Sequence, residues 1–211
     1  METGAAPSID DLAAAMHLER ADVVERLCAL QEYHGVVLQP DSSEIWAAHP
    51  FSAAPTSFWV STETMNWWGN CAWCSLGIAA LARTDTTIST SLGAEGRPVA
   101  LHVRSGAVIE QNYVVHFPIP MRNAWDNVVY TCSTMLLFDN EKSVDEWSAR
   151  HHIPKGDVVP VGVAWSLAQR WYGRHLDADW SKWSVDEAAE IFRDVGLRGP
   201  IWDLTATSGR F

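Results

Sequence analysis

The segment Asn66 to Arg83, NWWGNCAWCSLGIAALAR, decides how the rest of the chain is interpreted. It begins as an aromatic loop and becomes an apolar run at helical spacing, with Asn70 placed to cap a helix. Cys71 and Cys74 form a C-x-x-C pair at the expected helix start, which places both sulfurs on one face of the first turn. The positive end of the helix dipole favours a thiolate, so we expect Cys71 in particular to be more acidic than a free cysteine.

A C-x-x-C pair by itself leaves three interpretations open: a redox pair, half of a zinc site, or two small residues of a core. The sequence has no second C-x-x-C or H-x-x-x-H pair at a spacing suited to structural zinc. The strands expected after the pair are antiparallel, which disfavours a thioredoxin-like βαβ unit. Cys28 occupies a helical apolar position and is expected in the core, and Cys132 lies in a segment interpreted as a strand.

Residues 1–55 are predicted to form an acidic module. Ser8 can cap a short helix, a second periodic run follows, and two β-prone stretches complete a winged-helix-like pattern. Residues 1–50 hold nine acidic residues and only Arg20 and Arg26 as cations, whereas a DNA-reading helix needs Arg and Lys. We therefore place a domain boundary in the Pro- and Ala-rich stretch 49–56 and expect no nucleic-acid partner.

Residues 56–211 are predicted to form a mixed domain with a central antiparallel sheet and flanking helices, which makes the whole chain α+β. Capping-box patterns at Ser143 and Ser184 predict two helix starts, residues 161–175 predict a further helix, and Gly196 is well placed to end the last one. The predicted strands are Thr86 to Leu92, Val99 to Val103, Ala107 to Phe117 and Val128 to Phe138.

Length and composition narrow the function classes. With 211 residues and 47% hydrophobic content, the chain is long and apolar enough for one large domain or two small ones. The formal net charge of -11 repels phosphate backbones and anionic lipids. No run approaches the roughly 18 apolar residues of a membrane helix, and the N-terminus lacks a leader pattern, so we expect a cytoplasmic protein without a membrane partner. Twelve tryptophans suggest an aromatic-lined pocket as well as a core.

The order of these features resembles one known family. An acidic winged-helix-like module precedes a helix that opens on C-A-W-x-x-L at Cys71, and strands follow. A second cysteine, Cys132, then stands in a segment that ends in Phe138 before a capped helix. This order resembles the organomercurial (alkylmercury) lyase family, most strongly from Trp67 to Leu81 and from Thr131 to Trp147. The resemblance implies an enzyme that takes a small-molecule organomercurial and needs no organic cofactor.

The resemblance also implies a site of two cysteines and an aspartate three residues after the first. The two cysteines correspond to Cys71 and Cys132, and the aspartate position to Cys74, which departs from the family pattern. Cys71 and Cys132 would then be the thiolate ligands and nucleophiles, with Cys74 as third ligand and candidate proton donor. Thiolates are the soft ligands that mercury prefers, and a neutral thiol can still protonate a departing carbon. Three sulfurs should release Hg(II) more slowly than two.

Two other functions stay open on the sequence. The thiols of Cys71, Cys74 and Cys132 can instead hold a soft metal, Hg, Cu or Zn, without any turnover. The same scaffold can also host an enzyme with a different, for example biosynthetic, substrate and Cys71 as its nucleophile.

Several aromatic side chains have a structural and a functional interpretation. Trp67, Trp68 and Trp73 either wall a dry pocket or pack the helix onto the sheet. For His116 a structural role is favoured over a proton shuttle. Residues 151–152, both histidines, are interpreted as partners of a helix dipole at its C-terminal end rather than as ligands.

Overall fold

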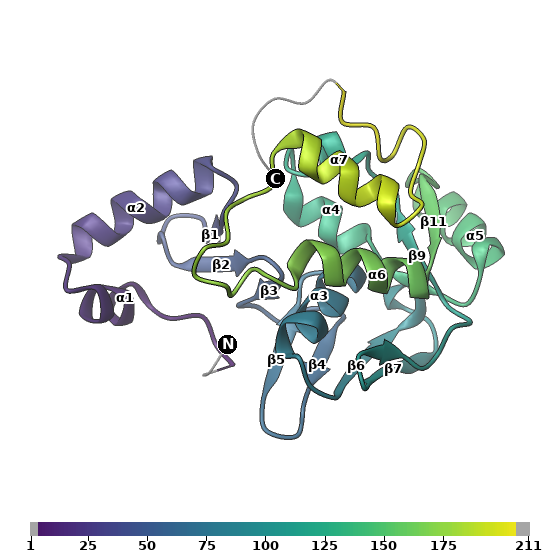
Figure 1. The fold of residues 1–211 in the computed structure, drawn as a ribbon, viewed down its shortest axis with the longest axis horizontal. Coiled ribbons are helices and arrows are strands. Elements are labelled where there is room, and N and C mark those ends of the chain that lie inside the picture. Colours follow the sequence, from purple (N-terminus) through teal and green to yellow (C-terminus); the bar gives the residue numbers. More distant parts are fainter. Residues whose placement is uncertain (1–3, 206–211) are drawn as a thin grey trace.

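The computed structural model describes residues 4–205 and has an α+β architecture in which helices pack around two antiparallel sheets (Figure 1). The helices are α1 (Ile9–Met16), α2 (Arg20–Glu32), α3 (Ala72–Ala82), α4 (Val128–Thr134), α5 (Glu141–His151), α6 (Val161–Tyr172) and α7 (Val185–Asp194), with 3-10 turns at Leu92–Ala94 and Met121–Asn123. The strands are β1 (Val37–Leu38), β2 (Ile45–Ala48), β3 (Phe51–Ser52), β4 (Trp59–Ser61), β5 (Asn66–Gly69), β6 (Thr86–Ser91), β7 (Pro98–Arg104), β8 (Ala107–Val108), β9 (Val114–Phe117), β10 (Leu137–Phe138) and β11 (Asp157–Pro160). The predicted α+β class is confirmed.

The larger sheet has the strand order β1-β2-β3-β5-β4-β6-β7-β8, and every neighbouring pair is antiparallel. At its centre Ile88 pairs with both Val60 and Leu101, and all three side chains are buried. Strict alternation of buried and exposed residues along β6 matches the period of a sheet with one covered face.

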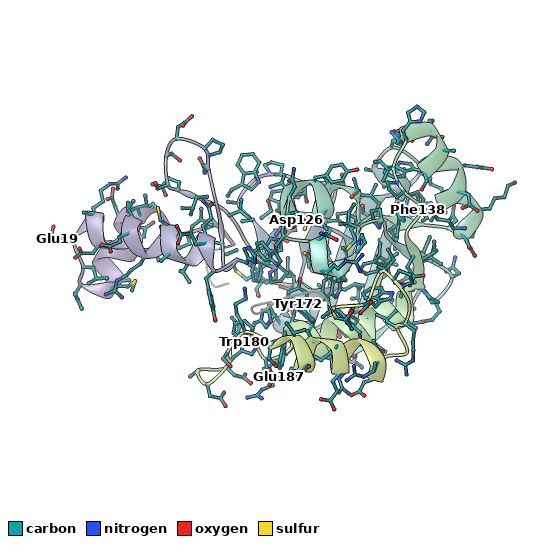
Figure 2. The ribbon with its side chains drawn as sticks, turned by 90° about the horizontal axis from the view of Figure 1, so that it is seen from above. Glu19, Asp126, Phe138, Tyr172, Trp180 and Glu187 are labelled. Atoms are coloured by element: carbon teal, nitrogen blue, oxygen red, sulfur yellow. The ribbon has the colours of Figure 1, made fainter. Side chains whose placement is uncertain are left out.

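The N-terminal helices lie at one end of the molecule, where Figure 2 labels Glu19. They have a small core of their own, formed by Ile9, Val23, Leu27 and Ile45. The hairpin of β1 and β2 follows as predicted, and β2 pairs onward with β3, so the sheet continues across the stretch where the sequence places a boundary. The winged-helix description and the division at residue 55 stay predictions.

The second sheet, β10-β9-β11, corrects one predicted strand. The expected single strand from residue 107 to 117 is two strands, because β8 closes the large sheet whereas β9 forms the middle of the small one. Val115 in β9 faces Leu137 on one side and Val159 on the other, and all three are buried.

The predicted strand from Val128 to Phe138 is wrong over most of its length, because residues 128–134 form α4 and only Leu137–Phe138 are extended. The Asn127 side chain accepts a hydrogen bond from the Tyr130 N–H at 3.0 Å and caps the helix. Helix capping and burial of one face therefore prevail over the β preference of this β-branched run.

The predicted helix starts are accurate to within three residues. The capping boxes of Ser8 and Ser184 are both formed, and they begin α1 and α7. Gly196 follows α7 with a φ of +85°. Ser143 is not a cap, because Asn140 begins α5 earlier and accepts the Ser143 N–H at 3.0 Å.

Cys28 is exposed, which contradicts the expectation that it belongs to the core. The buried positions of α2 are Val23 and Leu27, four residues apart on one face, and Cys28 is one step around the helix from that face.

No helix between residues 4 and 205 has both the length and the apolar character needed to cross a bilayer.

Helix α3, the helix predicted after the C-x-x-C pair, lies in the middle of the molecule and packs along α6. Its residues Ala72 to Ala79 are all buried. Gly77 permits the close approach of α6, because a Cβ there would lie 2.3 Å from the ring of Tyr172. This contact brings the Tyr172 side chain beside the start of α3.

Candidate functional site

The three cysteines proposed from the sequence come together where α3 begins and α4 ends. Cys71 is the N-cap of α3, and its sulfur accepts the Cys74 N–H at 3.2 Å. Cys132 lies in the last turn of α4, and the Ala72 N–H donates to the Met135 carbonyl at 3.0 Å. This hydrogen bond ties the two helix ends together, so the thiols of Cys71, Cys74 and Cys132 interact with one another.

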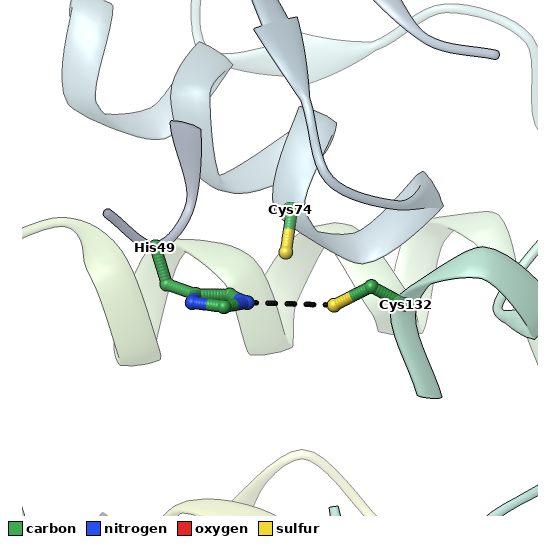
Figure 3. Close-up of side chains that lie close together, drawn as sticks. All are labelled: His49, Cys74 and Cys132. Carbon is green, nitrogen blue, oxygen red and sulfur yellow. Dashed lines mark hydrogen bonds between the residues drawn. The ribbon is translucent and has the colours of Figure 1, made fainter. Parts of the chain in front are cut away.

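His49 joins the cluster from the turn between β2 and β3. Its Nε2 lies 3.4 Å from the Cys132 sulfur, and Cys74 points to the same place (Figure 3). One ligand atom from each of His49, Cys74 and Cys132 lies within 4.8 Å of the others, a separation suited to a shared metal ion. Sequence analysis missed His49 because it stands in the Pro-rich stretch treated only as a boundary, and nothing local marks it as a ligand.

Two further side chains complete the immediate surroundings of the sulfurs. The Tyr172 hydroxyl lies 3.7 Å from the Cys74 sulfur, and the Met135 thioether lies 3.5 Å from the Cys71 sulfur. The cysteine, tyrosine and methionine side chains are buried and His49 is half-buried, so electrostatic interactions within the cluster are only weakly screened by solvent.

The electrostatics of the cluster correct the expectation that Cys71 is more acidic than a free cysteine. Burial raises the pKa of Cys71 well above its usual value. Burial also opposes ionisation of Cys74, but hydrogen bonds from the Cys132 and Cys71 thiols, with smaller effects of His49 and Tyr172, lower the pKa of Cys74 well below its usual value. Hydrogen bonds to the other two thiols raise the pKa of Cys132. The arrangement therefore favours one thiolate, on Cys74, held between two thiols.

The cluster forms one wall of a cavity of about 620 Å³. Its other walls are largely aromatic and include Tyr33, Trp73, Trp125, Trp171, Tyr172 and Trp180. Figure 2 labels Tyr172 and Trp180, which come from α6 and from the loop that follows it. Trp73 thus belongs to the pocket that its sequence position suggested.

The other two tryptophans of the motif pack within the fold instead. Trp67 contacts the ring of Phe51 at a centroid distance of 6.3 Å, and Trp68 contacts Trp59 at 4.4 Å. Neither side chain lines the cavity.

His116 has structural contacts. It is fully buried in β9, where its Nε2 lies 3.2 Å from the Pro154 carbonyl and its ring packs against Phe138 and Trp147. Burial lowers the pKa of His116, and its side chain does not line the cavity. Residues 151–152 end α5 as expected, and His151 lies 3.1 Å from a Glu95 carboxylate oxygen.

A buried cluster of thiols at the wall of an apolar cavity offers the donor atoms that a soft metal or an organometallic compound prefers. The comparison with known families agrees with this chemistry: the model of MerB, alkylmercury lyase, matches residues 51–173, and the chain belongs to this family. The match includes all three clustered cysteines, whereas His49 lies just outside it.

A solved structure supports the same fold. The crystal structure of the mercury-bound form of MerB2 superposes with a TM-score of 0.66 at 19% sequence identity, and the match covers 83% of each chain. Comparison with curated proteins gives no match.

Proposed function

We propose that this protein is an organomercurial lyase that captures R–Hg⁺ on the thiols of Cys71, Cys74 and Cys132 and breaks the carbon–mercury bond by protonolysis. The observation that carries the proposal is the convergence of these three thiols on one wall of an apolar cavity, in a chain of the alkylmercury lyase family.

The first step is capture by Cys74. The lowered pKa of its thiol supplies a thiolate, which bonds to mercury and displaces the ligand X⁻ of R–Hg–X. The site is then R–Hg–S with two neutral thiols beside it, because the pKa values of Cys71 and Cys132 are raised.

The second step is proton transfer to carbon. Mercury that approaches the sulfur of Cys132 or Cys71 acidifies that thiol, whose proton moves to the carbon of R. The hydrocarbon R–H leaves, and Hg(II) stays bound to two thiolate sulfurs. The oxidation state of mercury does not change, so the reaction needs no reductant and no organic cofactor.

This chain has Cys74 where the family pattern has an aspartate, and this difference changes the source of the proton. A carboxyl group at this position would carry a proton of its own, whereas here the first thiolate and the proton come from different members of one sulfur cluster. The third sulfur also offers Hg(II) an additional ligand, so product release should be slow.

The experiment that tests the proposal uses the reduced full-length protein. It is incubated separately with phenylmercury, Hg(II) and Cu(I), and benzene release and bound metal per chain are measured. Benzene released over several turnovers supports a lyase. Cys28→Ala provides the matched control, because this exposed cysteine lies outside the cluster and its loss should change nothing. Absence of benzene release in the presence of an excess thiol that removes Hg(II) would refute the proposal.

A second candidate, a soft-metal-binding protein without turnover, is favoured by one observation. His49, Cys74 and Cys132 bring three ligand atoms within 4.8 Å of one another, and thiolate with imidazole is a donor set that suits Zn(II) or Cu(I) as well as Hg(II). One tightly held metal per chain with no benzene release would favour this candidate over the lyase.

A further inference from the structure

The cavity beside the thiol cluster carries an unusual charge for this protein. The chain has a formal net charge of -11, yet among residues 4–205 no carboxylate lines the cavity. Its one lysine or arginine is Lys182. Asp126, next to Trp125, acts electrostatically on His34 but is not part of the lining. An acidic protein thus presents a cation to whatever enters this cavity.

Lys182 is held in place from several sides. Its ammonium group donates to the Tyr33 carbonyl at 2.6 Å and to the His34 carbonyl at 3.4 Å. It lies 5.0 Å from the centre of the Tyr33 ring and 5.6 Å from that of Trp125. These contacts fix the position of the charge at the cavity wall.

A second polar group in the same wall has no partner. Trp180 lines the cavity, and its indole N–H is buried without a hydrogen-bond acceptor in the part of the chain that the structure describes. An indole N–H can only donate, and an unsatisfied buried donor is costly, so it is suited to an acceptor on a ligand. The neighbouring His175, whose ring lies 3.9 Å from that of Trp180, also leaves its Nε2 without a partner among the described residues.

We propose that Lys182 and the indole N–H of Trp180 form an anion-binding subsite, and that the preferred substrates are aromatic organomercurials that carry a carboxylate or sulfonate. This inference rests on the proposed lyase function. The aromatic walls suit a flat apolar ring, the thiol cluster takes the mercury, and the subsite binds the acidic group of the same molecule. A volume of about 620 Å³ is ample for a substituted benzene ring, and methylmercury would leave most of it unfilled.

The test compares kcat/KM for 4-carboxyphenylmercury and for phenylmercury, which differ in the acidic group. We expect the wild-type protein to prefer the carboxylated substrate by about tenfold or more, as a charge-assisted hydrogen bond permits. Lys182→Gln should abolish most of that preference, because kcat/KM for the carboxylated substrate should fall far more than kcat/KM for phenylmercury. Lys182→Arg, which keeps the charge, should retain it, and Trp180→Phe should reduce it while keeping an aromatic wall.

The control is Lys142→Gln, which changes the net charge by the same amount as Lys182→Gln. The Lys142 side chain lies on α5, is 85% exposed and does not line the cavity. Thermal melting of each variant checks that the fold is intact. A wild-type protein with no preference, or a preference lost equally in Lys142→Gln, would overturn the subsite.

A mercury-free pair of probes separates this inference from the proposed function. Binding of 2-naphthoate and of 2-naphthylmethanol is measured by calorimetry in the wild type and in Lys182→Gln. Tighter binding of naphthoate that depends on Lys182 supports the subsite even if no organomercurial is cleaved. Turnover of phenylmercury without any naphthoate preference would refute the subsite and leave the lyase proposal standing.

Discussion

The imidazole Nε2 of His49 lies 3.4 Å from the sulfur of Cys132, although 83 positions separate the two residues in the chain. The contact connects the turn after β2 to the last turn of α4 and so links the N-terminal hairpin to the thiol cluster. Burial lowers the pKa of His49, while the nearby Cys74 acts in the opposite direction, and the ring is neutral at pH 7. A neutral imidazole can serve as a metal ligand.

Replacement of this ring tests whether it binds metal. His49→Ala should weaken Zn(II) binding by about tenfold or more, because Zn(II) uses imidazole and thiolate together. Hg(II) affinity should change little, since soft thiolates dominate it. Competition with a chromophoric chelator measures both. His102→Ala is the control, because His102 pairs with Glu110 away from the cavity. Equal Zn(II) affinity in wild type and His49→Ala would exclude His49 as a ligand.

Restoring the family's carboxylate at position 74 tests the proposed reaction. In Cys74→Asp, capture passes to the thiols of Cys71 and Cys132, and burial should raise the pKa of the new carboxyl group, so that it carries a proton to the carbon. We expect benzene release from phenylmercury to rise by about tenfold, within the range for a positioned acid. Hg(II) should also leave faster to a competing thiol, because only two sulfurs remain. Cys74→Ser, which offers neither a soft ligand nor a comparable acid, is the control and should lose activity. If neither the wild type nor Cys74→Asp releases benzene, the lyase chemistry has been lost in this chain.

Cys71 has both a chemical and a structural role, and two variants separate them. Cys71→Ala should strongly reduce turnover, because it removes one of the two neutral thiols that can protonate the carbon and then bind Hg(II). It should also lower the free energy of unfolding by about 1 kcal/mol because α3 loses its cap. Cys71→Ser keeps a capping oxygen, so it should lose turnover while recovering most of that stability. Urea unfolding and benzene release are measured on the same samples. Unchanged turnover in Cys71→Ala would mean that Cys71 takes no part in the reaction.

The sequence predicts the parts of this site that are marked by local pattern. The helix after Cys71, the Ser8 cap, the Ser184 capping box and the antiparallel sheet follow from periodicity and from side-chain caps. The convergence of Cys132 on Cys71 does not, because it depends on long-range packing, of which the main-chain hydrogen bond between Ala72 and Met135 is one contact. Without the family resemblance, nothing in the spacing would have indicated it.

The sequence-based predictions that failed depend in the same way on contacts between residues far apart in the chain. Apart from Cys132, residues 128–134 are β-branched or hydroxylated, yet Asn127 caps them as a helix whose buried face meets the cluster. The order of the three thiol pKa values depends on which sulfur accepts hydrogen bonds from the other two. That arrangement exists only in the folded protein, so the sequence alone does not predict it. His49 stands alone in its stretch of sequence, and its role arises only when β3 pairs with β5.

The contact between α3 and α6 should be sensitive to a single methyl group. Gly77→Ala places a Cβ against the ring of Tyr172, which cannot move without displacing its contact with Cys74. We expect a loss of about 1–3 kcal/mol in the free energy of unfolding, the usual cost of overpacking a core. Combining it with Tyr172→Leu should recover part of that loss. Chemical denaturation of the two single variants and the double variant measures the coupling; additive effects would show that the ring and the glycine do not interact.

Acid should destabilise the protein through histidines that are buried in their neutral form. Burial lowers the pKa of His175 from 6.5 to about 4. Since the unfolded chain takes up the proton first, the contribution of His175 is fully present above about pH 6.5 and is lost as the pH falls towards 4, by at most about 3 kcal/mol. Burial also lowers the pKa values of His49 and His116, so these two histidines act in the same direction.

The variant His175→Phe isolates one part of this acid sensitivity, because it keeps an aromatic ring against Trp180 but removes the titrating group. Urea unfolding at pH 7 and at pH 4.5 should show a smaller loss of stability in His175→Phe than in the wild type. His17→Phe, at an exposed histidine that ends α1, should lose as much stability as the wild type between the same two pH values. An equal loss in His175→Phe and the wild type would mean that protonation of His175 does not limit stability, and that the acid sensitivity arises at the other buried histidines.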